Sequence, residues 1–75
     1  MSGKEIRAKI LYETKRLAYI MVEVNEKIMV SMIVDNDKKA VVGVGVSRRE
    51  AFECARNVVE GNEELEKELE ELELQ

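Results

Sequence analysis

Runs of apolar residues separated by short polar turns predict most of the secondary structure of this chain. Residues 19–24, 28–34 and 40–46 are rich in β-branched side chains, which favour strands. The links between them, residues 25–27 and 35–38, are too short for a crossover between parallel strands. The pattern therefore predicts three strands that form an antiparallel meander.

The segment of residues 2–16 fits two patterns. Ser2 and Glu5 have the spacing of a helix capping box, and apolar side chains recur at helical spacing from Ile6 to Leu17. The same stretch also alternates between Ile6 and Tyr12, which is typical of a strand. We favour the helix, and the strand stays open as the alternative.

Two further helices are predicted after the strands. Ser47 is placed to cap the first, and Gly61 to end it, since glycine readily adopts a left-handed conformation. Asn62 then begins an acidic segment whose leucines share one helical face. An isolated helix of this length is marginal in water. We expect the segment to pack on its own domain, on a second copy or on another protein, or else to remain a disordered tail.

The expected fold is α+β, in the order α-β-β-β-α, with a three-stranded antiparallel sheet, two helices on one of its faces, and a C-terminal acidic helix. Residues 1–61 form the expected domain, and residues 62–75 the acidic amphipathic segment. The sheet face toward the helices is expected to carry Ile20, Val22, Val24, Ile28, Val30, Met32, Val34, Val42, Val44 and Val46. The opposite face is expected to carry Tyr19, Met21, Glu23, Met29, Ser31, Ile33 and Val41. That second face is mostly apolar, and an exposed apolar patch usually marks an interface.

Composition argues against several classes of function. The chain has 75 residues, one cysteine and no histidine, so a Cys/His zinc site and an internal disulfide are excluded. Cys54 lies among apolar helix positions and is interpreted as a core thiol. Because no nucleophile stands beside a base, we expect no enzyme. We also expect no metal, no cofactor and no small-molecule substrate.

Charge is distributed unevenly along the chain. The total is −4, but residues 62–75 alone carry seven glutamates and one lysine. Residues 1–61 are mildly basic, which permits a phosphate-binding face. No apolar run approaches the roughly 18–20 residues that span a bilayer, so we expect a cytoplasmic protein without a membrane partner.

The stretch 42–51, Val-Gly-Val-Gly-Val-Ser-Arg-Arg-Glu-Ala, together with Ala55, resembles the most recognisable motif of the double-stranded RNA-binding domain family. That motif reads Gly-x-Gly-x-Ser, two basic residues, any residue, Ala, three residues, Ala. Residues 10–13 also resemble the family's first-helix segment, with Glu13 at a position where the family often has glutamate. The architecture and the Val-Gly-Val-Gly run are similar to the amino-terminal domain of the fifth small-subunit ribosomal protein.

The resemblance implies binding of structured RNA at the start of the helix that follows the last strand. Backbone N–H groups capped by Ser47 and two arginines beside them would suit a phosphate. The implied RNA-binding residues are Arg48, Arg49, Arg56, Ser47, Glu13, Lys38 and Lys39. The chain departs from the family at Phe52, where a basic residue is typical, and in the loop 25–27, which lacks the Gly-Pro-x-His sequence that reaches a second groove.

These departures favour a non-enzymatic binding module on this scaffold, one that associates with itself, as a dimer, or with a ribonucleoprotein such as the ribosome. The predicted protein interface consists of Tyr19, Met21, Met29, Ile33, Val41, Phe52, Leu65, Leu69 and Leu72. Direct binding of ribosomal or duplex RNA is the alternative. A remoter alternative is an engineered α+β protein without natural function, because the sequence is proline-free and rich in helix caps.

Overall fold

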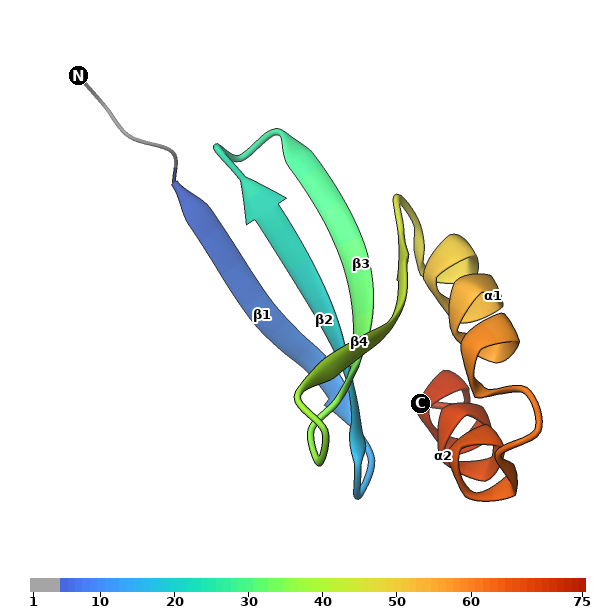
Figure 1. The fold of residues 1–75 in the computed structure, drawn as a ribbon. Coiled ribbons are helices and arrows are strands. Elements are labelled where there is room, and N and C mark those ends of the chain that lie inside the picture. The colour runs from blue at the N-terminus through green and yellow to red at the C-terminus, as the bar shows by residue number, and fades with distance from the viewer. Residues whose placement is uncertain (1–4) are drawn as a thin grey trace.

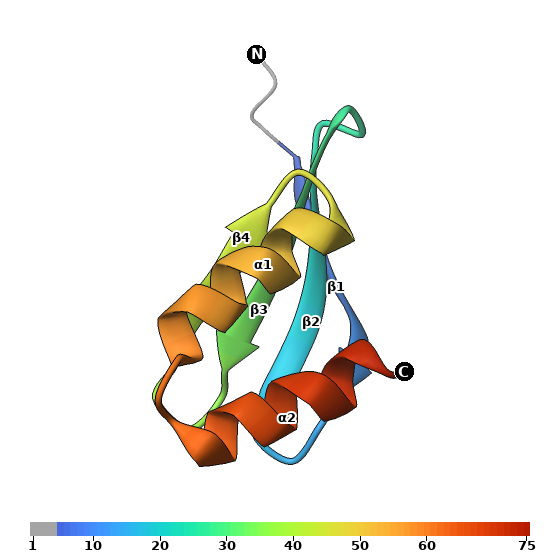
Figure 2. The same cartoon turned by 90° about the vertical axis from the view of Figure 1, so that its right-hand side faces the viewer.

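The computed structural model describes residues 5–75, apart from the side chain of Ile28. Its elements are β1 (Ile6–Glu13), β2 (Leu17–Val24), β3 (Ile28–Asp35), β4 (Ala40–Gly45), α1 (Arg48–Val59) and α2 (Glu63–Glu73). The strands form one antiparallel sheet in the order β1-β2-β3-β4. Both helices cover the same face of this sheet (Figures 1 and 2). The α+β class is confirmed, with four strands in place of the expected three.

The N-terminal segment is a strand, so the preferred prediction of a helix there was wrong. Its alternating residues Ile6, Ala8 and Ile10 lie opposite apolar residues of β2 in an antiparallel register. Pairing with β2 satisfies the backbone of this segment and matches its two-residue period, which outweighs the helical spacing. The register shifts between Ile10 and Tyr12, so Leu11 forms a β-bulge. The predicted cap at Ser2 lies outside the described residues.

A tight turn at Asn25 and Glu26 joins β2 to β3. Both residues have positive φ, 53° and 61°, and the amide of Lys27 donates to the carbonyl of Val24 at 3.0 Å. This is the conformation of a type I′ turn, whose twist suits an antiparallel hairpin. Asn25 also exchanges two hydrogen bonds with the backbone of Glu5, each of 2.7 Å, and so extends the pairing of β1 with β2.

Two glycines of β4 allow α1 to lie directly on the sheet. A Cβ atom added to Gly43 would stand 2.4 Å from the carbonyl oxygen of Ala51 and 2.8 Å from the Cβ of Ala55. One added to Gly45 would stand 2.5 Å from the Cβ of Glu50. The glycines and alanines that carry the family resemblance are therefore required here by close packing of a helix on a strand.

The predicted boundaries of the two helices after the sheet are confirmed. The hydroxyl of Ser47 accepts a hydrogen bond from the amide of Glu50 at 3.2 Å, and the side chain of Asn62 accepts one from the amide of Leu65 at 3.2 Å. Gly61 links the helices with a φ of 91°, a left-handed conformation that glycine adopts at little cost. Each cap satisfies a backbone donor that the helix itself leaves unpaired.

The hydrophobic core lies between the sheet and the two helices. Its members are Leu17, Tyr19, Ile33, Val42, Ala51, Phe52, Ala55, Val59, Leu65, Leu69 and Leu72. The last three come from α2, which packs against β2 and α1. Of the alternatives left open for the acidic segment, the structure shows packing on its own domain.

The two faces of β2 and β3 are exchanged relative to the prediction, whereas Val42 of β4 lies in the core and Val41 is exposed, both as expected. Tyr19 and Ile33, expected on the outer face, point toward the helices and are almost fully buried. Gly43 pairs with Ile33 in the register of β3 and β4, and α1 lies directly over Gly43. The helix therefore covers the face that contains the glycines, and the valine-rich face is left on the other side.

Candidate interaction surface

One face of the sheet is apolar across all four strands and is not covered by either helix. Its residues form three rows in the strand register: Ile6 with Val24, Ala8 with Val22 and Val30, and Ile10 with Ile20, Met32 and Val44. We call these nine residues the open face. The helices lie on the opposite side of the sheet, toward the viewer in Figure 2. All nine residues were expected in the core or in a helix, and none was predicted at an interface.

The open face is accessible to solvent in the single chain. Ile6 is 62% exposed, Ile10 56% and Val44 47%, and the residues in the middle of the face are half-buried by their neighbours in the sheet. An antiparallel sheet covered on one side normally carries polar residues on its other side. The alternation of Ile6, Ala8 and Ile10 indicates the β1 part of this surface, but the same stretch also has helical spacing, which favoured the other prediction.

Most of the predicted protein interface is buried in the core. Tyr19, Ile33, Phe52, Leu65, Leu69 and Leu72 are each at most 6% exposed. They pack against each other between helices and sheet, so their apolar character serves the core. Met29 and Val41 are about half exposed, at 48% and 51%. Met21 is half-buried and borders a shallow hollow with Leu11 and Met29 on the helix side of the sheet.

Arg48 is engaged by the protein itself. Its guanidinium carbon lies 5.6 Å from the ring centre of Tyr12, 5.7 Å from that of Tyr19 and 5.2 Å from that of Phe52. The same group donates to the carbonyl oxygen of Glu73 at 2.6 Å. The helix dipole favours a cation beside the carbonyl groups at the C-terminal end of α2. Stacking of the guanidinium on the three rings stabilises the arginine further. Arg48 thus fastens the end of α2 to the core.

The other residues implied in RNA binding are spread over the molecule. Arg56 pairs with Glu73 of α2 at 2.5 Å, whereas Arg49 is 87% exposed and lies 4.0 Å from Glu53. Lys38 and Lys39 are exposed in the turn before β4, at the end of that strand remote from Ser47. The carbonyl oxygen of Glu13 accepts a hydrogen bond from the side chain of Gln75 at 2.9 Å. The structure places Arg48, Arg49 and Arg56 around one hollow on α1 and separates the two lysines from them.

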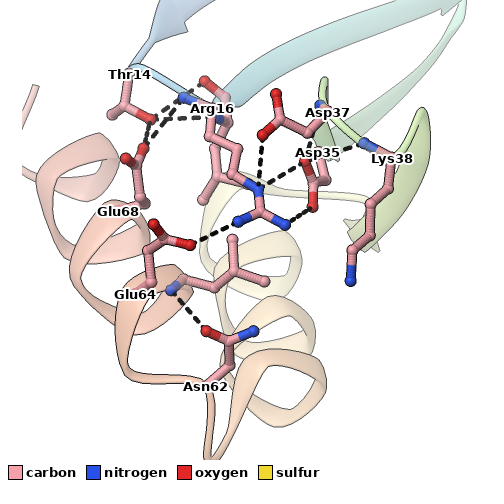
Figure 3. A network of polar contacts seen from close by, with 10 residues as sticks. Thr14, Arg16, Asp35, Asp37, Lys38, Asn62, Glu64 and Glu68 are labelled. Carbon is pink, nitrogen blue, oxygen red and sulfur yellow. Dashed lines mark hydrogen bonds and ion pairs between the residues drawn. The ribbon is translucent and has the colours of Figure 1, made fainter.

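A polar network that the sequence did not indicate joins α2 to the end of the sheet that contains the β1–β2 and β3–β4 turns (Figure 3). The Arg16 guanidinium makes two contacts of 3.1 Å with Asp35, one of 3.5 Å with Asp37 and one of 2.7 Å with Glu64. Glu68 accepts hydrogen bonds from the hydroxyl of Thr14 and the amide of Arg16. The charges of Arg16, Asp35, Asp37 and Glu64 are paired with one another, and Glu68 accepts its two hydrogen bonds from uncharged donors, which indicates a structural role.

Asp35 is the buried member of this network, with 1% of its surface exposed. Burial alone would raise the pKa of its carboxyl group. The hydrogen bonds from Arg16 and from the amides of Lys38 and Asp37 outweigh that effect and hold the pKa below its ordinary value of 3.8. The Asp35 hydrogen bond, opposed by desolvation, likewise raises the pKa of Arg16. The ionised pair is therefore the stable form in the folded protein.

Asp35→Asn is expected to lower the free energy of unfolding at neutral pH by about 2 kcal/mol, because a buried charge-assisted pair is lost. The folded pKa lies below the unfolded one, so the contribution of Asp35 is complete above about pH 5 and disappears as pH falls through the folded pKa. The gap between wild type and variant, measured by urea denaturation, should close below about pH 4. Asp37→Asn, at a largely exposed carboxylate, should cost little at any pH. A gap independent of pH would contradict the assignment.

Comparison with protein-family models, with curated proteins and with solved structures finds no match for this chain. Within residues 5–75, neither helix has the length and apolar character needed to cross a membrane. The same residues contain no group of three or more His, Cys, Asp or Glu side chains that would suit a metal ion. Cys54 is a half-buried free thiol on α1, more exposed than a core position.

Proposed function

We propose that this chain is a non-enzymatic protein-association module that contacts its partner through the open face. The observation that carries the proposal is the composition of that face: nine apolar residues in three continuous rows, none of them buried. Scattered apolar residues are normal on protein surfaces, whereas a continuous apolar patch marks a contact site.

The fold itself gives no reason for this composition. The helices pack on the other side of the sheet, so polar residues in these rows would leave the core unchanged. Threonine and charged residues are compatible with strands at solvated positions. Nine apolar side chains facing water instead favour association with another apolar surface, because burial removes them from water. The stability of the single chain does not require an apolar open face, whereas a role in binding explains it.

Direct RNA binding, the alternative drawn from the sequence, has weaker support. It relies on Arg49 and the capped start of α1, with the neighbouring arginines Arg48 and Arg56 already bound to the end of α2. Glu73 stands beside those arginines and would repel a phosphate backbone. The two hypotheses differ in the surface they use, so one experiment separates them.

Affinity capture with the purified chain tests the proposal. Ile20→Lys and Met32→Lys, two neighbouring positions in the centre of the open face, are expected to abolish association with the partner, self or other. The matched control is Val58→Lys on α1, at a position 59% exposed and outside the open face. Capture should survive ribonuclease and the control substitution. Partners lost after ribonuclease treatment, or after Arg49→Glu but not after Met32→Lys, would contradict the proposal and favour RNA.

A further inference from the structure

We infer that the partner of the open face is the open face of a second copy of this chain, so that two sheets stack as a β-sandwich with the helices outside. The inference rests on the proposed function and names its partner. The absence of charge on the face, the placement of charge elsewhere, the shape of the sheet and its area each point to this occupant.

The open face offers a partner no polar group from its side chains. Its members are isoleucine, valine, alanine and methionine throughout. A partner with charged or hydrogen-bonding groups would bury them here without compensation, which is costly. The complement must therefore be equally apolar, and a second open face meets this requirement.

The charges of the chain lie where stacked sheets would keep them apart. Residues 48–75, which contain both helices, carry ten acidic and four basic residues. These helices lie on the side of the sheet remote from the open face (Figure 2). Stacked sheets are about 10 Å apart, so the two acidic layers would be separated by more than the Debye length of about 8 Å. Association through the helices would instead bring like charges together.

Two copies of one sheet also match in shape. Strands of every sheet twist with the same hand, and sheets of equal twist stack with their strands about 30° apart. A two-fold axis through the centre of the open face gives both copies the same contacts and closes the assembly at two chains. No filament follows from such a contact.

The area of the uncovered side of the sheet lies at the lower bound for a dimer interface. Three strands of eight residues and one of six, spaced about 4.8 Å apart, give the whole of this side, of which the open face is the central part, a flat footprint of about 470 Å² per copy. Both copies together would lose about 1,000 Å² of accessible surface, which is the lower bound for a specific interface. Homodimer interfaces are also the more apolar ones, as this face is.

The free edge at β1 is a less suitable contact. All eight residues of β1 are exposed, but the bulge at Leu11 interrupts the ladder. Antiparallel pairing of two β1 strands about Ala8 would set Arg7 of one copy opposite Lys9 of the other, and such like charges are destabilising. Charged side chains and bulges are the usual means by which proteins block edge pairing. The face, and not the edge, is the expected contact.

Sedimentation equilibrium of the purified full chain tests the inference. The wild type and Val58→Lys should both sediment at twice the 8.6 kDa of one chain. Ile20→Lys and Met32→Lys should raise the dissociation constant at least about 100-fold, because each buries an unpaired charge at the interface. In the single chain a lysine at either position can extend its amine into water, so both variants should keep the wild-type circular dichroism spectrum.

A second measurement on wild type needs no substitution. In a mixture of ¹³C-labelled and unlabelled chains, an isotope-filtered NOE experiment should detect contacts between copies at the methyl groups of Ile20, Val22 and Met32. Contacts between copies at β1 edge amides or at the helices would overturn the inference. A chain that is monomeric at every concentration, yet captures another protein in a Met32-dependent way, would also overturn it and leave the proposed function standing. A monomer without such capture would remove both.

Discussion

A chain in which Leu65, Leu69 and Leu72 are all replaced by alanine is expected not to fold. Each of these leucines is buried in the single core shared by the sheet and both helices, with at most 6% of its surface exposed. Replacing a buried leucine by alanine costs about 2–5 kcal/mol. Three such losses amount to about 6–15 kcal/mol, which is comparable to the total stability of about 4–11 kcal/mol that is usual for a domain of this length. The NMR spectrum of the variant should lack the dispersed amide resonances of a folded protein.

The matched control replaces Lys67, Glu70 and Glu71, three exposed residues of the same helix, by alanine. Helix propensity is unchanged or improved in this control, and no core contact is removed. It should therefore retain the wild-type spectrum and melt within a few degrees of wild type. If the leucine variant kept a folded sheet and α1, residues 62–75 would be a separable segment and the description of one shared core would be wrong.

Gly43→Ala is expected to destabilise the protein strongly, although it adds only one methyl group. The new Cβ would stand 2.4 Å from the carbonyl oxygen of Ala51, and that oxygen belongs to the backbone of α1. The helix must therefore move away from β4, which opens the packing around Ala55 and Phe52. Overpacking of this kind costs about 3 kcal/mol, a large part of the stability of a small domain. Urea denaturation monitored by circular dichroism measures the loss.

Gly61→Ala is the control for the chemistry of this change. A Cβ at Gly61 would have no atom within 4 Å, and only its φ of 91° opposes the substitution. The cost of a non-glycine residue in this conformation is about 1 kcal/mol. Gly43→Ala should therefore lower the free energy of unfolding by clearly more than Gly61→Ala. Equal losses would show that α1 does not rest on β4 as described.

The local signals in the sequence predicted elements better than they predicted faces. Ser47, Gly61 and Asn62 marked the helix ends correctly, because caps depend on neighbouring residues. The helix prediction for residues 6–13 was wrong because helical and alternating patterns overlap in this segment. Only pairing with the next strand, β2, decides between them. That contact is not encoded in the spacing of the segment itself.

The faces of β2 and β3 were assigned in reverse because both faces of these two strands are largely apolar. In such strands the alternation does not show which side is covered. Gly43 and Gly45 carried the missing information: a helix can approach closely only above residues without side chains. Their pairing with Ile33 and Ser31 identifies the covered face, but the register is needed to use it.

The residues of the candidate site differ from those predicted because their surroundings depend on contacts between distant parts of the chain. The prediction that an apolar sheet face lies outside the core agrees with the structure, while its members differ. The roles of Arg48 and Phe52 depend on the return of α2 to the core, where the arginine lies between the rings and the helix end. A motif compared over ten residues cannot reveal a contact made by residues near position 73. Arg16 and Asp35 were missed because they are 19 residues apart in the chain.

The most direct test of the central claim is the accessibility of open-face methyl groups to a soluble paramagnetic agent. In the single chain Ile10 is 56% exposed and Val58 59%, so contact between these side chains and water is nearly equal. If the open face is buried against a second copy, the methyl resonances of Ile10, Ile20 and Met32 should resist broadening while those of Val58 broaden strongly. Equal broadening of Ile10 and Val58 would show a sheet face open to water and would contradict the account.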